Sequence, residues 1–226
     1  MALNASKVET KFKKPDVLEA GGYPGRLVQL IDLGLQPQSF EGKATEPARE
    51  IYITLELSDE FLKDEEGNDL KDKPRWFSEF FPLRHIKSEK AKSTKRYLAF
   101  DPTNKYDGDW TKLLGLPVIV NLVQNPSKKD KNVVYNNIGS LSAIRAKDAE
   151  RLPPLVNPTK VFDLDDPDME VFKALPEFLQ QKITANLEFN GSKLQALLGG
   201  KPAERVVSVA ASQDDPHVEL DDENPY

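Results

Sequence analysis

Apolar and polar residues alternate with a period of two along several segments of the first 150 residues. The clearest case is 50–57, where Ile51, Ile53, Leu55 and Leu57 alternate with polar or aromatic neighbours. This period places the apolar side chains on one face of a β-strand. The same pattern, with β-branched and aromatic residues, predicts four more strands at 23–33, 75–83, 117–124 and 133–144.

The segment between the third and fourth predicted strands has no period of two. Residues 88–100 are rich in Lys, Ala and Leu, which favour a helix, and Ser88 is placed to cap its N-terminus. Trp110 follows in a Pro- and Gly-bearing loop, where we expect a short helical turn and a structural anchor. Residues 36–47 and 59–74 are polar and carry Pro or Gly, so both are predicted to be loops.

The predicted order is three strands, one helix and two strands. This is the order of an oligonucleotide-binding (OB) barrel, a five-stranded Greek key with its helix between strands three and four. The fold class is therefore expected to be mainly β, with an OB-like barrel over 21–152 and an N-terminal arm over 1–20.

The residue pattern changes after residue 152, from strand-like alternation to prolines and helix signals. Pro153, Pro154 and Pro158 indicate a stiff linker, and Asp166 followed by Pro167 is typical of a helix start. We expect helix from 169 to about 187, interrupted near Pro176, and a last short helix over 192–198 closed by two glycines. Residues 153–200 are thus predicted to form a helical appendage, and 201–226 a flexible acidic tail.

Charge is segregated along the chain, whose formal net charge is −6. Residues 206–226 hold six acids and neither Lys nor Arg, so the preceding 205 residues balance at 31 basic and 31 acidic groups. Residues 71–147 hold 16 basic and 7 acidic groups. A basic middle segment suggests a polyanionic ligand, and an acidic tail can compete with that ligand for the same basic surface.

The sequence offers little for catalysis. It has no Cys and two His, which excludes a thiolate metal site and leaves a His-based triad or metal cluster without partners. We therefore expect no enzyme activity, no metal and no cofactor. Lack of Cys fits a reducing cytoplasm, the N-terminus lacks a secretory h-region, and no apolar run is long enough for a bilayer.

Basic and aromatic residues are interleaved from about 75 to 110. Single-stranded DNA binding needs cations along the phosphates and flat side chains that stack on bases. A solvated helix face explains the lysines equally well, and at least half of the aromatic residues are expected in the core. The candidate DNA-binding residues are Tyr52, Arg75, Trp76, Phe80, Arg84, Lys87, Lys90, Lys92, Lys95, Arg96, Lys128, Lys129, Lys131 and Tyr135.

The chain ends in Asp221, Asp222, Glu223, Asn224, Pro225 and Tyr226. Together with the order of elements and the basic-aromatic middle, this ending resembles single-stranded DNA-binding replication proteins, especially those of bacteriophages. The resemblance implies an OB-fold that coats single strands in replication or recombination, in the host cytoplasm if the protein is phage-encoded. It also implies that Asp221, Asp222, Glu223, Pro225 and Tyr226 recruit a polymerase, primase, helicase or nuclease.

Three other functions remain open at this stage. The same barrel serves a strand-annealing recombination protein, which an annealing assay would separate from a passive coat. A protein-interaction module or DNA mimic would use the acidic tail as its active surface and would not retain an oligonucleotide. A metal-dependent nuclease would consume its substrate when magnesium is added.

Overall fold

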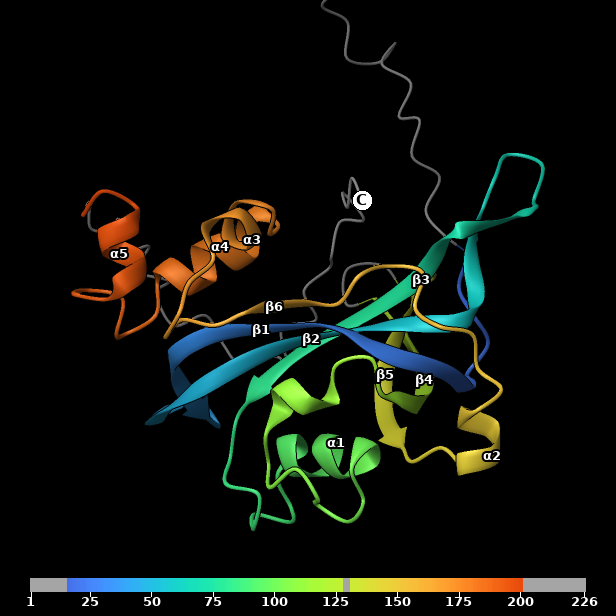
Figure 1. The fold of residues 1–226 in the computed structure, drawn as a ribbon, viewed down its shortest axis with the longest axis horizontal. Helices are drawn as coiled ribbons and strands as arrows, with labels where there is room; N and C mark the ends of the chain where they lie inside the picture. The colour runs from blue at the N-terminus through green and yellow to red at the C-terminus, as the bar shows by residue number, and fades with distance from the viewer. Residues whose placement is uncertain (1–15, 128–130, 201–226) are drawn as a thin grey trace, which may run out of the picture.

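A curled antiparallel sheet is the centre of this protein, as the computed structural model shows for residues 16–127 and 131–200 (Figure 1). Its strand order is β3-β2-β1-β4-β5, and β6 pairs with β1 in parallel. The predicted mainly β class and the five antiparallel strands are confirmed. The strands are β1 (Gly21–Phe40), β2 (Lys43–Lys63), β3 (Asp69–Pro82), β4 (Pro117–Pro126), β5 (Val134–Ser142) and β6 (Lys160–Phe162).

The helices are short and lie on both sides of the sheet. In Figure 1, α1 lies below the sheet, and α3 and α4 lie above it. The predicted helix between strands three and four is present, but it starts at Lys92, after Ala91, which makes no side-chain cap. Residues 85–91 form hydrogen-bonded turns instead of a Ser88-capped helix. The helical elements are α1 (Lys92–Phe100), η2 (Trp110–Leu113), α2 (Ala146–Ala149), α3 (Met169–Lys173), α4 (Glu177–Thr184) and α5 (Lys193–Leu197).

The β1–β2 hairpin is longer than the sequence predicts. Residues 36–47 are not a loop, because Phe40 pairs with Lys43 across a two-residue turn. Glu41 and Gly42 both have positive φ, which is the backbone of a tight hairpin turn. The predicted loop over 59–74 is likewise mostly strand, so that only 64–68 connects β2 to β3. Most side chains of the two extensions are exposed or half-buried, and neither segment shows a sustained apolar alternation.

The inner face of the curled sheet encloses the larger core. Its apolar side chains come from all five long strands and pack against α1 and η2. Trp110 is buried, as predicted, with its ring centroid 5.6 Å from that of Phe81 and 5.7 Å from that of Tyr97. This core places α1 beneath the open side of the sheet.

In the part of the chain that the structure describes, the two outer strands β3 and β5 are not paired by backbone hydrogen bonds. Side chains connect them instead. The Arg96 guanidinium donates to Glu79 on β3 at 2.6 Å and to the carbonyl oxygens of Ile138 and Gly139 on β5, both at 3.3 Å. At the other end of the gap, the backbone N–H of Leu18 donates to the Asn136 side chain at 2.7 Å. The predicted barrel is therefore a curled sheet whose gap is filled by α1 and residues 16–18.

A second core lies on the outer face of β1 and β2. Tyr52 and neighbouring apolar residues of the sheet pack there against α3, α4 and α5. α3 starts at Met169 as expected, but Asp166 is not its capping residue: the Asp168 side chain caps it by accepting hydrogen bonds from the N–H groups of Glu170 and Val171. The predicted last helix is present as α5, and the Ser192 side chain caps it by accepting from the Gln195 N–H. The core residues are Ile31, Leu33, Tyr52, Phe162, Phe172, Leu175, Leu179, Ile183, Phe189 and Leu194.

Leu179→Ala tests whether the C-terminal helices and the sheet form one cooperative unit. Leu179 is 1% exposed within the second core, so the substitution should cost about 2–5 kcal/mol of unfolding free energy. We expect the thermal unfolding of the variant to be a single transition at a lower temperature than that of the original chain. Far-UV and near-UV circular dichroism should give the same midpoint. A separate early transition of the helices, with an unchanged main transition, would contradict shared cooperativity.

Candidate nucleic-acid interface

The outer face of β3 carries a row of two aromatic residues and a hydroxyl. Trp76, Ser78 and Phe80 alternate along this edge strand, and each is half-buried. They pair across the ladder with Glu56, Thr54 and Tyr52 of β2, respectively. Because successive side chains of a strand point to opposite faces, these three share the outer face while Phe77, Glu79 and Phe81 point inward.

A buried carboxylate fixes the orientation of Trp76. The indole N–H donates to Glu56 at 3.2 Å, and Glu56 is only 3% exposed. The same carboxylate accepts hydrogen bonds from the backbone N–H of Val156 at 2.6 Å and from the Asn157 side chain at 2.7 Å. The indole is therefore held rigidly beside the segment that leads to β6, with part of its surface open to solvent.

Phe80 lies under a cation from the C-terminal helices. Lys182 of α4 places its ammonium nitrogen 4.3 Å from the centre of the Phe80 ring and 2.9 Å from a Glu50 carboxylate oxygen. An ammonium at this distance over an aromatic face is attracted by the ring quadrupole. Lys182 is a site residue that sequence reasoning missed.

Tyr52 does not have the predicted stacking role. Its side chain is 6% exposed and lies in the second core, where its ring centroid is 6.1 Å from that of Phe178 in an edge-on arrangement. Burial raises the pKa of Tyr52, since the phenolate would have to form away from water. The C-terminal helices cover this position, so Tyr52 is a core residue in this structure.

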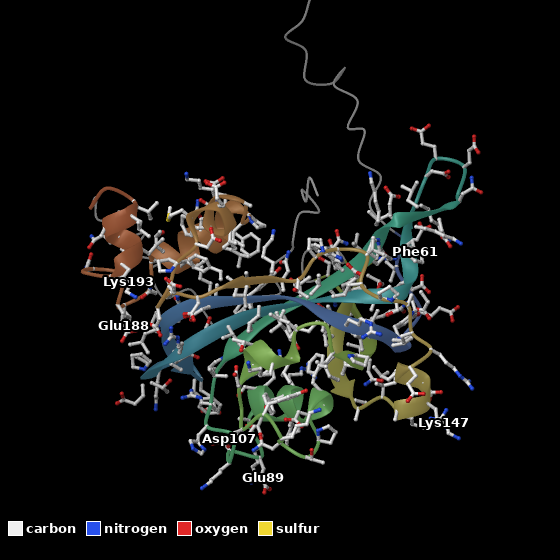
Figure 2. The ribbon with its side chains drawn as sticks, viewed as in Figure 1. Phe61, Glu89, Asp107, Lys147, Glu188 and Lys193 are labelled. Atoms are coloured by element: carbon white, nitrogen blue, oxygen red, sulfur yellow. The ribbon has the colours of Figure 1, made fainter. Side chains whose placement is uncertain are left out.

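Exposed cations follow β3 directly. Arg84, Lys87 and Lys90 lie in the segment between β3 and α1, and Lys95 lies on α1 itself. Within the described part of the chain none of these four forms an ion pair. Glu89 and Asp107 are acidic side chains at the same lower end of the molecule (Figure 2). We call Arg84, Lys87, Lys90 and Lys95 the cation cluster.

Two predicted phosphate contacts have other roles. Arg96 is 5% exposed and pairs with Glu79, so the prediction that it contacts phosphates at the surface is wrong. Its guanidinium instead connects β3 to β5. Lys92 also pairs with Glu79, at 2.8 Å, but its side chain is 50% exposed. It remains within reach of a ligand at the margin of the cation cluster.

The remaining candidates lie at the opposite end of the sheet or outside the described residues. Arg75 precedes Trp76 on β3. Its guanidinium carbon lies 5.8 Å from the centre of the Phe77 ring, and the guanidinium donates to the Asp16 carbonyl oxygen. Lys131 is exposed, and Tyr135 is half-buried on β5. Residues 16–18 lie between this part of β5 and Arg75 on β3. Outside the described residues lie Lys128 and Lys129, between β4 and β5 in the sequence, and the C-terminal residues Asp221, Asp222, Glu223, Pro225 and Tyr226.

Trp76, Phe80 and the cation cluster thus share the stretch 76–95, with the aromatic row on the outer face of β3 and the cluster in the segment from the end of β3 into α1. Lys131 and Tyr135 lie apart from this stretch. In the comparisons with known proteins, no family model and no curated protein matches this chain. Over residues 16–127 and 131–200, no group of three or more His, Asp or Glu side chains is arranged to hold a metal ion. The helices of this same region are all too short or too polar to cross a membrane.

Proposed function

We propose that this protein binds single-stranded nucleic acid along the outer face of β3 and across the cation cluster. The strand order supports an OB-like fold for this purpose: β1 to β3 form a meander, β4 lies beside β1, β5 lies beside β4, and α1 falls between β3 and β4. OB-folds use the face of strands two and three to bind oligonucleotides.

One observation carries the proposal: the strand that bears the aromatic row, β3, is followed after Phe81, Pro82 and Leu83 by exposed cations. Phe80 lies four residues before Arg84, so the chain length limits their Cα separation to about 14 Å. A base stacked on Phe80 would therefore have its phosphate within reach of Arg84, the first cation of the cluster. Stacking accepts any base and phosphate contacts carry no sequence information, so the binding is expected to be independent of sequence.

The proposed role is that of a coat on exposed single strands during DNA replication or recombination, without turnover of the strand. The acidic tail would shield the cations when no strand is bound and would recruit replication proteins once displaced. The second candidate, strand annealing, uses the same surface and is separated from coating by an annealing assay.

Phe80→Leu tests the aromatic row. Loss of one stacking ring should weaken binding of a fluorescein-labelled oligo-dT by about 1–3 kcal/mol, or roughly 5- to 150-fold in Kd, measured by fluorescence anisotropy at low salt. Leu keeps an apolar side chain beside Lys182, and circular dichroism checks that the fold is retained.

The matched control is Phe40→Leu at the tip of the β1–β2 hairpin. Phe40 is 68% exposed and lies outside the proposed interface, so its substitution should leave the Kd within about twofold. Equal effects of the two substitutions would contradict a specific role for the β3 row, and unchanged affinity of Phe80→Leu would remove this row from the interface.

A further inference from the structure

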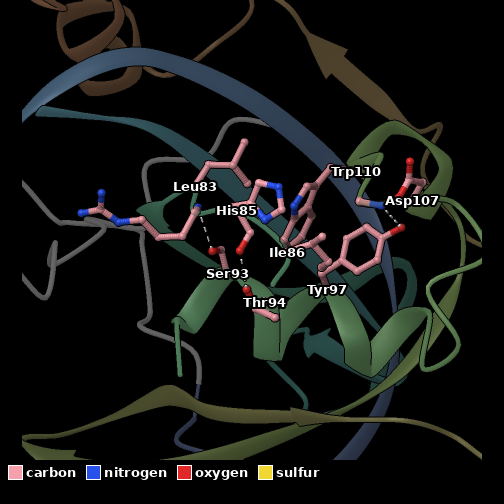
Figure 3. Close-up of a pocket in the computed structure, with 10 residues that line it drawn as sticks. Leu83, His85, Ile86, Ser93, Thr94, Tyr97, Asp107 and Trp110 are labelled. Atoms are coloured by element: carbon pink, nitrogen blue, oxygen red, sulfur yellow. Dashed lines mark hydrogen bonds between the residues drawn. The ribbon is translucent and has the colours of Figure 1, made fainter. Parts of the chain in front are cut away.

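A cavity of about 220 Å³ opens beside the cation cluster, between the segment that follows β3, the first turns of α1 and the loop before η2 (Figure 3). Leu83, Ile86 and the indole of Trp110 form its apolar walls, and His85, Thr94 and Asp107 supply polar atoms. Drug-sized ligands occupy cavities of about 300–1,000 Å³, so this one suits a smaller group, such as a single planar ring system.

Some polar atoms of the wall are already used by the fold. The Tyr97 hydroxyl donates to Asp101 at 3.2 Å and accepts from the Gly108 N–H at 3.0 Å. Burial raises the pKa of Tyr97 to about 12, so this hydroxyl stays protonated near neutral pH. The Tyr97 hydroxyl thus connects the loop before η2 to α1, and these contacts hold this wall of the cavity in place.

Two polar groups at the rim remain available to a ligand. The His85 Nδ1 atom accepts from the Lys87 N–H at 3.2 Å, so in the neutral ring the proton is on Nε2, which becomes a donor. The Asp107 carboxylate has no hydrogen-bond partner within the described residues. Asp107, with a φ of 50°, and Gly108, with a φ of 81°, both line the cavity.

We infer that this cavity holds one nucleobase of the bound strand, with its phosphate on the neighbouring cations. The inference rests on the proposed function. A nucleobase is planar and apolar on its faces and carries donors and acceptors along its edge, which matches apolar walls with one donor, His85 Nε2–H, and one acceptor, Asp107.

The position of the cavity links it to the rest of the interface. His85 lies five residues after Phe80, so their Cα atoms are at most about 18 Å apart. Arg84 lines the cavity, and Lys87 follows in the same segment. A strand that leaves the β3 row would thus reach the cavity while its phosphates remain on the cation cluster, and the unstacked base would be removed from water.

Trp110 reports on this site directly. The chain has two tryptophans, so Trp76→Phe leaves Trp110, in the cavity wall, as the only indole while it keeps an aromatic ring at position 76. In this background, oligo-dT and thymidine 5′-monophosphate are titrated separately, with indole emission recorded for both and anisotropy of labelled oligo-dT measured in parallel. We expect saturable quenching of Trp110 by the oligonucleotide at the same midpoint as the anisotropy change, and weaker quenching by the mononucleotide at the same site.

Two substitutions at the rim are compared with one beside it. His85→Ala and Asp107→Asn should each weaken oligonucleotide binding on the order of fivefold, because each removes a donor or an ionised acceptor for the base. Glu89→Gln removes the same negative charge from the same region but does not line the cavity, and it should leave affinity equal or higher. Loss of an acid next to cations would by itself strengthen binding of an anion, so weaker binding of Asp107→Asn identifies a base contact.

The outcomes separate the cavity from the proposed function. Normal anisotropy binding with unchanged Trp110 emission overturns the cavity inference and leaves single-strand binding in place. Absence of oligonucleotide binding by the intact chain, measured by the same anisotropy titration, overturns both. Quenching by the mononucleotide alone, with no binding of the oligonucleotide, also overturns the inference, since the cavity would then serve a free nucleotide.

Discussion

Arg96→Met should destabilise the protein by about 3 kcal/mol. Removal of one partner from a buried ion pair typically costs about 3–5 kcal/mol, because the other charge is left in a poorly hydrated site. Arg96 and Glu79 have side chains only 6% and 9% exposed, and Arg96 also satisfies two carbonyl oxygens of β5. We expect the lower end of the range because Lys92 still pairs with Glu79.

The measurement is urea unfolding followed by circular dichroism, with Lys92→Met as the matched control. Both substitutions remove a cation bonded to Glu79, but the Lys92 side chain is 50% exposed and should contribute about 1 kcal/mol or less. Similar losses from the two variants would contradict the role of Arg96 in joining β3 to β5.

Neutralising the cation cluster should have the largest effect on binding. With Arg84, Lys87, Lys90 and Lys95 all changed to Gln, affinity for oligo-dT should fall on the order of 100- to 1,000-fold at about 50 mM salt. Each phosphate contact to a single strand contributes roughly 0.7 to the slope of log K against log salt. If all four cations contact phosphates, the slope should become shallower by about 3.

A second quadruple variant controls for total charge. Lys63, Lys147, Arg151 and Lys173 are exposed and lie outside the cluster, and their replacement by Gln changes the net charge by the same amount. This variant should show a slope close to that of the original chain. Equal slopes and equal affinity losses in the two quadruple variants would show that overall charge, and not the cluster, governs binding.

The period-two segments of the sequence were sufficient to predict the sheet. Residues 50–57 alternate because one face of β2 lies in the inner core. The helix α1, between β3 and β4, was predictable because that alternation is lost there. The β1–β2 extension was not, since 37–47 are largely solvated on both faces and their pairing depends on a two-residue turn. β6 was also missed, because three residues that pair with β1 carry too short a pattern.

The candidate site was predictable in composition but not in arrangement. Residue type and spacing marked Trp76, Phe80 and the lysines, whereas burial of Tyr52 and Arg96 depends on contacts with residues far away in the sequence. Tyr52 is covered by α4, more than 100 residues later, and Arg96 is aligned with Glu79 only when α1 crosses the gap between β3 and β5. The second core itself shows that residues 153–200 pack against the sheet as part of its structure.

The most direct test is a titration of the intact chain with a labelled single-stranded oligonucleotide over a series of salt concentrations, with a duplex of equal length in parallel. We predict tight binding of the single strand at low salt, a linear fall of log K with log salt, and weaker binding of the duplex, whose bases cannot stack on Trp76 and Phe80. No retention of the single strand at low salt, or an affinity that salt leaves unchanged, would contradict the proposed function.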